Sequence, residues 1–337
     1  MAESTAMISR RLLLAATPAA VAVSALAIPD PALPASADGG DFQAFLSSVR
    51  AEARRLGISA ETLLQAFAGV APNAKVLERI HHQPEFTMTW AQYRTMLINA
   101  KRINAGRAAW WQNQLLLQQV QDRYGVPPGV ILGIWGLESS FGTKTGDYRV
   151  IEALATLAWD SSRAAFFRPE LMAALRILDR GDITPPQMTG SYAGAMGQPQ
   201  FMPSSYLRYA VDFRGDGRAD IWTSTPDVLA SIANYLARSG WRTRESWGMQ
   251  VVLPAGFDDG LAGRENRQPL GAWQQAGVRA ANGGLLAGAE EAALVLPDGV
   301  GGEAFLTFGN FKAIRRYNPS DFYALVVGLL GDAILAS

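Results

Sequence analysis

The sequence predicts a mainly α-helical protein with a small β-rich insert, preceded by an N-terminal segment outside the fold. Three observations lead to this class: apolar residues recur at helical spacing through most of the chain, short alternating runs occupy residues 249–302, and helical spacing returns from Asn310. With 337 residues, 49% of them hydrophobic and 18% charged, the chain can bury one large core or two smaller ones. This composition argues against a disordered protein.

Residues 1–37 have the features of a secretory signal peptide. Arg10 and Arg11 precede an apolar, alanine-rich run, and Ala-Ser-Ala at residues 35–37 forms a small-residue cleavage site. The paired arginines indicate the twin-arginine export route. An uncleaved N-terminal anchor is the alternative, because the apolar run is nearly long enough to span a bilayer. The prolines and small residues favour cleavage, which predicts an exported, periplasmic protein whose mature form has no membrane span.

Helical signals dominate from about residue 41 to residue 178. Spacing of the i, i+3, i+4, i+7 type holds for Phe42, Phe45, Leu46 and Val49. Ser59 resembles a helix start, and Gly125 ends a later helical stripe. Between residues 249 and 302 two alternating runs each end at a proline among many glycines, which indicates the β-rich insert. Residues 322–335 predict a closing helix.

The composition excludes several kinds of chemistry. Thirty Lys and Arg balance thirty Asp and Glu, so the overall charge indicates neither nucleic acid nor an anionic membrane as a partner, although a local basic groove could be hidden in a zero sum. The absence of cysteine excludes disulfides, thiolate nucleophiles, cysteine zinc sites and a lipid-modified N-terminal cysteine. The two histidines are adjacent, His81 and His82, which disfavours a multi-histidine metal site. A carboxylate is therefore the expected acid–base group.

Glu138 is the candidate for that group. Pro127 and Pro128 suit the first turn of a helix. The residues after them are apolar on every face, so this helix is predicted to be buried, with Glu138 at its end. A carboxyl group on a buried helix loses hydration, which raises its pKa and suits a general acid at neutral pH. The alternative is a glutamate that reaches solvent, or pairs with an arginine, where the helix ends.

Residues 190–206 mix small residues, amides, hydroxyls and aromatic rings without helix or strand periodicity. Hydrogen-bonding groups and flat faces are provided by Ser191, Gln198, Gln200, Tyr192 and Phe201. This mixture suits a sugar, which has hydroxyl groups at its rim and C–H faces above and below. The alternative is a packed connection between helices, with Ser204 as the N-cap of the second helix.

Several long motifs in the same order closely resemble the lytic murein transglycosylase B family, glycoside hydrolase family 103. The motifs are ESSFG (138–142), IEALATLAWD (151–160), the run 190–222, and FGNFKAIRRYNPSDFYALVV (308–327). The resemblance covers about residues 41–335 and implies a lysozyme-like helical core with an additional N-terminal helical region and a small β region. On this basis we expect one unit at 38–337, with a helical region at 38–100, the core at 101–248 and 303–337, and the β-rich insert at 249–302.

The resemblance also implies an activity, namely cleavage of the β-1,4 bond between N-acetylmuramic acid and N-acetylglucosamine in peptidoglycan without addition of water. Glu138 matches the family's acid/base. It would protonate the glycosidic oxygen and then, as carboxylate, take the proton of the muramoyl O6 hydroxyl, which closes onto C1 to give a 1,6-anhydro end. No cofactor is required, the glycan strand is the partner, and cell-wall synthesis or division proteins are candidate further partners. By the same resemblance the cleft is lined by Ser191, Gln200, Phe201, Met202, Tyr93, Tyr235, Tyr317 and Asn318.

Two short segments depart from the family pattern. Ser139-Ser140-Phe141 replaces a Thr-Arg-Trp version after the acid, and Gln198-Pro199 replaces Tyr-Gly. Because both segments adjoin matched positions, we expect the differences to alter subsite preference and to leave Glu138 in place.

A turn at residues 212–220 resembles a calcium loop. Asp212 and Asp216 stand at positions one and five with glycine at six, and some family members bind calcium here, with Asp227 matching a later ligand. Against this, Arg214 places a cation where an oxygen ligand belongs, and Thr223 stands where an EF-hand has a bidentate glutamate. Calcium, if bound, would have a structural role. The alternative is a turn in which the two aspartates pair with arginines.

Two other classes of function remain open from the sequence. One is a hydrolase of the same core, which would release reducing ends in place of anhydro ends. The other is a peptidoglycan-binding protein without catalytic activity. Binding alone would not need an acid, so the retention of Glu138 favours an enzyme.

Overall fold

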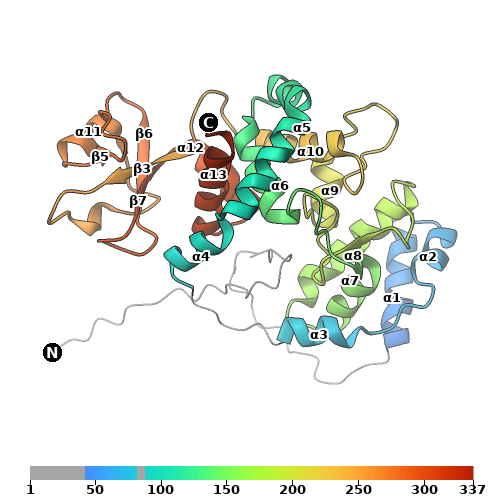
Figure 1. Cartoon of the computed structure of the whole chain (residues 1–337). Coiled ribbons are helices and arrows are strands. Elements are labelled where there is room, and N and C mark those ends of the chain that lie inside the picture. The colour runs from blue at the N-terminus through green and yellow to red at the C-terminus, as the bar shows by residue number, and fades with distance from the viewer. Residues whose placement is uncertain (1–41, 82–87, 337) are drawn as a thin grey trace, which may run out of the picture.

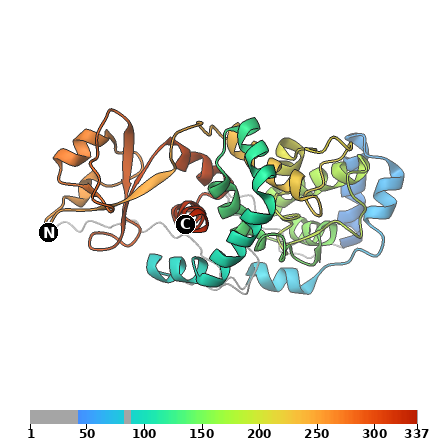
Figure 2. The same ribbon diagram turned by 45° about the horizontal axis from the view of Figure 1, so that its top comes forward.

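The computed structural model describes residues 42–81 and 88–336 of the chain. It confirms the mainly α-helical fold with small sheets. The predicted signal peptide, residues 1–37, lies outside the described residues. Helices around a first apolar core occupy one end of the molecule, the larger sheet occupies the other end, and a second helical core lies between them (Figures 1 and 2).

The first core is formed by six helices and the loops that join them. Its interior is built from Leu46, Leu154, Leu175 and other buried apolar side chains. The helices are α1 (Phe42–Arg55), α2 (Ala60–Ala66), α3 (Ala74–His81), α7 (Val150–Trp159), α8 (Ala164–Asp179) and α9 (Pro203–Tyr209), with a two-stranded antiparallel sheet of β1 (Tyr148–Arg149) and β2 (Thr189–Gly190) beside them.

The second core lies in the middle of the molecule (Figure 1). It is built from α4 (Trp90–Leu97), α5 (Ala100–Tyr124), α6 (Pro128–Ser139), α10 (Thr225–Arg238), α12 (Gly309–Tyr317) and α13 (Asp321–Leu335). Helix α5 contains a kink at Asn113, whose side-chain amide donates to the Ala109 carbonyl group over 2.8 Å. The closing helix expected at 322–335 is α13.

The larger sheet has five antiparallel strands in the order β4-β6-β7-β3-β5. The strands are β3 (Gly248–Val252), β4 (Arg267–Pro269), β5 (Arg279–Ala280), β6 (Glu291–Val295) and β7 (Ala304–Thr307), and a short helix α11 (Leu270–Gln275) and a 3₁₀ turn η1 (Asp259–Leu261) cover a third, smaller core. The sheet therefore extends past the expected insert, 249–302, because β7 follows residue 302.

Helix α4 connects the larger sheet to the second core. The Trp90 backbone N–H donates to Asp298 over 2.7 Å, and its indole N–H donates to Glu303 over 2.6 Å. The Trp90 ring also meets the Phe305 ring edge to face, with 5.8 Å between centroids. Because the N–H of this buried indole has a hydrogen-bond partner, the ring joins the helix to the sheet without leaving an unsatisfied polar group in the interior.

Capping and turn residues in the sequence correctly predicted most of the helix ends considered above. Ser59 is the N-cap of α2, Gly125 ends α5 in a left-handed conformation, and Pro128 occupies the first position of α6. The N-cap expected at Ser204 is wrong, because Met202 holds that position before Pro203 and the Ser204 hydroxyl donates to the buried Glu170 instead.

Glycines allow α6 and α13 to pack at close range. A Cβ on Gly133 would overlap the Val327 carbonyl oxygen, and one on Gly331 would overlap the Gly129 carbonyl oxygen. Small residues at such crossings let two backbones approach closely. Within the described ranges, no helix combines the length and the apolar character needed to cross a bilayer.

We expect Gly133→Ala to destabilise the protein by about 1–3 kcal/mol, because the added methyl group must push two packed backbones apart. Denaturant unfolding measures this change. Gly271→Ala on α11 is the matched control, since the nearest atom to its new Cβ would be 3.8 Å away. The control should be neutral, or stabilised by up to about 1 kcal/mol through helix propensity. Equal effects of the two substitutions would contradict the close packing.

Candidate active site

Glu138 lies in the interior of the second core. Every residue of α6 from Pro128 to Ser139 is buried, and Glu138 is only 4% exposed. Its carboxyl Oε1 accepts a hydrogen bond from the Tyr323 hydroxyl on α13, with 2.6 Å between the oxygens. The carboxyl group is therefore placed by two helices whose separation is set by the glycine contacts.

Burial raises the pKa of Glu138 to about 8, while the hydrogen bond from Tyr323 acts in the opposite direction and favours the charged form. The alternative of a glutamate that reaches solvent or pairs with an arginine does not hold, since no arginine pairs with it among the described residues. Burial consequently favours the protonated form of the side chain, which can act as an acid.

Three tyrosines surround this carboxyl group. Burial raises the pKa of Tyr93, Tyr317 and Tyr323, and in each case the nearby charge of Glu138 raises it further. Tyr93 and Tyr317 were predicted as cleft residues, whereas sequence reasoning missed Tyr323. A tyrosine within the apolar run 322–330 of α13 was the available signal, because a buried hydroxyl group requires a partner.

The loop after β2 folds back on itself through Met196, which bridges to Gly190 and to Phe201. Ser191 is buried in this loop, and its hydroxyl oxygen accepts the Ala195 backbone N–H over 3.0 Å. The fold thus places Ser191 and Phe201 in one compact segment at the edge of the first core.

Phe201, Tyr235 and Tyr317 form an aromatic wall. The centroid distances are 5.7 Å for Phe201–Tyr235, 5.8 Å for Phe201–Tyr317 and 4.6 Å for Tyr235–Tyr317. Tyr317 packs against both the first and the second core. Since Tyr317 also interacts electrostatically with Glu138, the wall and the acid belong to one site at the boundary of the two cores.

The other predicted residues, Gln200, Met202 and Asn318, are adjacent in sequence to members of this wall. Gln200 donates to the carbonyl groups of Thr145 and Gly197, over 2.9 and 2.8 Å. Asn318 is buried at the C-cap of α12, and Met202 is the buried N-cap of α9. The Asn318 side chain accepts the Ser320 backbone N–H over 3.1 Å.

The segments that depart from the family pattern also make specific contacts. Gln198 accepts from the Trp135 indole N–H of α6 over 2.9 Å and donates to the Trp222 carbonyl group. Pro199 offers its carbonyl oxygen to the Tyr317 hydroxyl over 2.6 Å. The replaced pair Gln198-Pro199 therefore links α6, the loop and α12.

Backbone strain accumulates at the same place. Two and three positions after the acid, Ser140 and Phe141 have φ values of 49° and 58°, and Gln200 has 51°. Left-handed conformations of residues other than glycine are costly and concentrate at functional sites. Only one other such residue occurs in the described part of the chain, Arg244.

The predicted calcium turn is held by hydrogen bonds from backbone N–H groups to its aspartates. The Asp212 carboxylate accepts the backbone N–H groups of residues 215–217, which lowers its pKa, and buried Asp227 accepts those of Phe213 and Asp220. Asp216 accepts from the Arg218 N–H. In residues 42–81 and 88–336 no three acidic or histidine side chains gather as metal ligands. Calcium binding stays a prediction.

Comparisons with known proteins agree with this geometry. Residues 41–332 match the transglycosylase SLT domain family. Membrane-bound lytic murein transglycosylase B of Escherichia coli K12 is 36% identical over 258 residues, which cover 73% of this chain and 67% of that protein.

Solved structures give the same result. Pseudomonas aeruginosa SltB3 in complex with NAG-anhNAM-pentapeptide superposes with a TM-score of 0.85 at 46% identity, covering 88% of this chain and 80% of that one. Escherichia coli lytic transglycosylase Slt35 in complex with calcium has a TM-score of 0.72 at 32% identity, with 87% and 92% covered.

The raised pKa of Glu138 predicts how stability varies with pH. Between about 4.5 and 8 the folded state keeps a proton that the unfolded state has lost, so the stability of the native protein falls as pH rises through this window. Glu138→Gln removes the titrating group. As pH rises through this window, the stability of the variant should therefore increase relative to that of the native protein by up to about 1.4 kcal/mol per pH unit. Denaturant unfolding at pH 5 and pH 8 tests this. A difference between the two proteins that is the same at both pH values would contradict it.

Proposed function

The chain belongs to the transglycosylase SLT family and is a lytic transglycosylase of peptidoglycan, and we propose that Glu138 is its catalytic acid and base. The observation that carries this proposal is a buried carboxyl group with a raised pKa, beside an aromatic wall at the boundary of two cores. An acid whose pKa lies near the working pH is efficient in both directions of proton transfer.

The reaction then runs in two proton transfers. Glu138 donates its proton to the glycosidic oxygen as the bond from that oxygen to C1 of N-acetylmuramic acid breaks, and the N-acetylglucosamine end leaves with a hydroxyl group. The resulting carboxylate accepts the proton of the muramoyl O6 hydroxyl while O6 bonds to C1. The acid is restored, a 1,6-anhydro ring is formed, and no water is consumed.

Tyr323 supports the first transfer as a positioning residue. Its hydroxyl donates to Glu138 over 2.6 Å and stabilises the carboxylate that exists between the two transfers. The partly exposed Tyr235 and Tyr317 offer flat faces to the sugar, with the buried Phe201 ring packed behind them, and keep bulk water away from C1. Holding O6 against C1 makes the attack intramolecular and removes much of its entropic cost.

Among the described residues no second carboxylate acts on Glu138, which argues against a two-carboxylate hydrolase. Ordinary retaining glycosidases need a second carboxylate about 5–5.5 Å from the first. Within the described ranges, no other carboxylate contributes to the pKa shift of Glu138. Glu152 on α7 accepts from Asn73 over 2.6 Å and pairs with Arg149 at 3.8 Å. Its interactions are those of a structural residue.

We further propose that the protein works in the periplasm. The signal-peptide features of residues 1–37 support export, and the relative in Escherichia coli is named as membrane-bound. A peptidoglycan substrate requires the same compartment in a bacterium with two membranes.

We expect Glu138→Gln to reduce lysis of purified peptidoglycan by more than the roughly 10²–10⁴-fold typical of acid–base assistance, because one residue serves both proton transfers. Turbidity of sacculi and muropeptide analysis measure this loss. Retention of more than about a tenth of the native rate would show that another group is the acid. An inactive native protein that still binds glycan would favour the non-catalytic alternative.

Digestion in water enriched in heavy oxygen separates the two reaction types. The transglycosylase should release anhydro ends without label, since O6 is the nucleophile. A hydrolase would place one solvent oxygen in each new reducing end. Labelled reducing ends as the main product would reverse the assignment, even with Glu138 essential.

Export is testable independently of activity. We expect the protein recovered from the periplasm to start at Asp38, and replacement of Arg10 and Arg11 by lysine to block export by the twin-arginine route. N-terminal sequencing and fractionation measure the two outcomes. Finding Met1 on the exported protein would disprove cleavage.

A further inference from the structure

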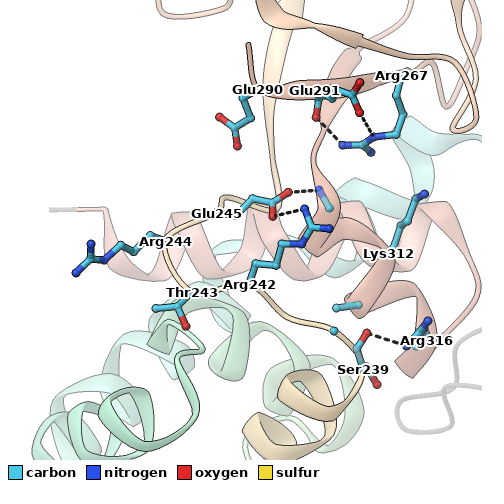
Figure 3. Close-up of a pocket in the computed structure, with 13 residues that line it drawn as sticks. Ser239, Arg242, Thr243, Arg244, Glu245, Arg267, Glu290, Glu291, Lys312 and Arg316 are labelled. Carbon is cyan, nitrogen blue, oxygen red and sulfur yellow. Dashed lines mark hydrogen bonds and ion pairs between the residues drawn. The ribbon is translucent and has the colours of Figure 1, made fainter. Parts of the chain in front are cut away.

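A pocket of about 690 Å³ lies outside the site around Glu138. Its walls come from the end of α10, the segment that follows it, one face of α12 and strands β4 and β6 (Figure 3). The pocket is therefore formed where the second helical core meets the sheet, and none of its lining residues belongs to the site described above.

The lining has an excess of positive charge. Five of its residues are lysine or arginine and three are glutamate. Two of the glutamates are already paired, Glu245 with Arg242 at 3.5 Å and Glu291 with Arg267 at 3.9 Å. Glu245 also accepts the Gly309 backbone N–H at the start of α12. The chain as a whole is neutral, so this local excess is a feature of the fold.

Two of the remaining cations are available to a ligand. Lys312 and Arg316 are one turn apart on α12, and Figure 3 shows both on the same side of the pocket, with Arg244 extending to the opposite side. Both are exposed. Arg316 donates only to the Ser239 carbonyl group, and in the part of the chain that the structure describes no carboxylate pairs with either residue.

Helix α12 connects these cations to the candidate active site. Tyr317, next to Arg316, belongs to the aromatic wall, and the Arg316 carbonyl oxygen accepts the Tyr235 hydroxyl over 2.6 Å. Residues 312 and 317 are separated by about 7.5 Å along a helix axis. The pocket thus begins within one or two helical turns of the wall that would hold the sugar.

The substrate offers an anion at that range. The SltB3 complexes contain glycan units that carry a pentapeptide. A pentapeptide has a free terminal carboxylate, and five extended residues reach about 17 Å from the sugar. A stem peptide on a muramoyl unit beside Tyr317 can therefore reach Lys312 and Arg316.

We propose that this pocket binds the carboxylates of peptidoglycan stem peptides through Lys312 and Arg316, and so favours peptide-bearing strands. The proposal rests on the proposed function, since it assumes a glycan in the neighbouring site. The Arg242–Glu245 turn shapes the opposite wall. It includes Arg244, which has a φ of 72° and is the fourth residue other than glycine with a left-handed conformation. Strain at this turn is consistent with a wall held in a defined shape for binding.

The test measures binding with the inactive Glu138→Gln protein, with and without Lys312→Glu. The ligands are muropeptide fragments with intact stems and the same fragments after an amidase has removed the stems. We expect Lys312→Glu to weaken binding of stem-bearing fragments about two- to fivefold at low salt, less at high salt, and to change binding of stripped fragments much less. Lys312→Gln should lie between.

Lys75→Glu is the matched control, because Lys75 is an exposed lysine on α3 at another part of the fold (Figure 1). It makes the same change in net charge and should leave both affinities unaltered. Thermal unfolding verifies that each variant is folded.

Several outcomes would overturn the proposal. An equal loss for stem-bearing and stripped fragments would assign Lys312 to glycan binding or to folding. No loss for either ligand would remove the pocket from substrate recognition. Phosphatidylglycerol vesicles serve as a third ligand. If Lys312→Glu weakened binding to these vesicles and to neither fragment, the anion would be a lipid headgroup. Because affinity is measured without catalysis, a failure here is distinct from a failure of the transglycosylase assignment, which product analysis of the native enzyme reports.

Discussion

The burial of helix α6 is the constraint on which the site depends. A helix that is apolar on every face must be covered on every side, and α13 provides one of these covers through backbone contacts that only glycine permits. The same packing brings the Tyr323 hydroxyl to Glu138 and removes water from the carboxyl group. Close packing, the raised pKa and the orientation of the acid therefore have one cause, and a change in the helix crossing alters all three.

The sequence predicted those parts that depend on local pattern. Pro128 and the apolar run indicated a buried helix ending near Glu138, and Ser59 and Gly125 marked helix ends that the structure confirms. Such local patterns do not predict contacts between residues that are far apart in the sequence. Tyr323 is 185 positions from Glu138, and its role depends on how two helices cross. The same limit applies to Ser204, whose partner is a glutamate on another helix.

Net charge proved a poor description of this surface. Thirty cationic and thirty anionic residues cancel over the chain, yet α12 presents Lys312 and Arg316 without paired carboxylates among the described residues. Buried and paired carboxylates account for part of the difference, because Glu170, Asp227 and Glu245 are used inside the fold. Electrostatic recognition by this protein has to be considered patch by patch.

The position of Tyr317 between two separate apolar cores has a consequence for cooperativity. The first core holds Phe201, and the second holds the helices of Glu138 and Tyr323, so each could lose its structure at its own temperature. A glycan held by both sides would act as a bridge, since neither core could open without releasing it. Ligand binding would then stabilise the two cores together and merge their melting into a single transition.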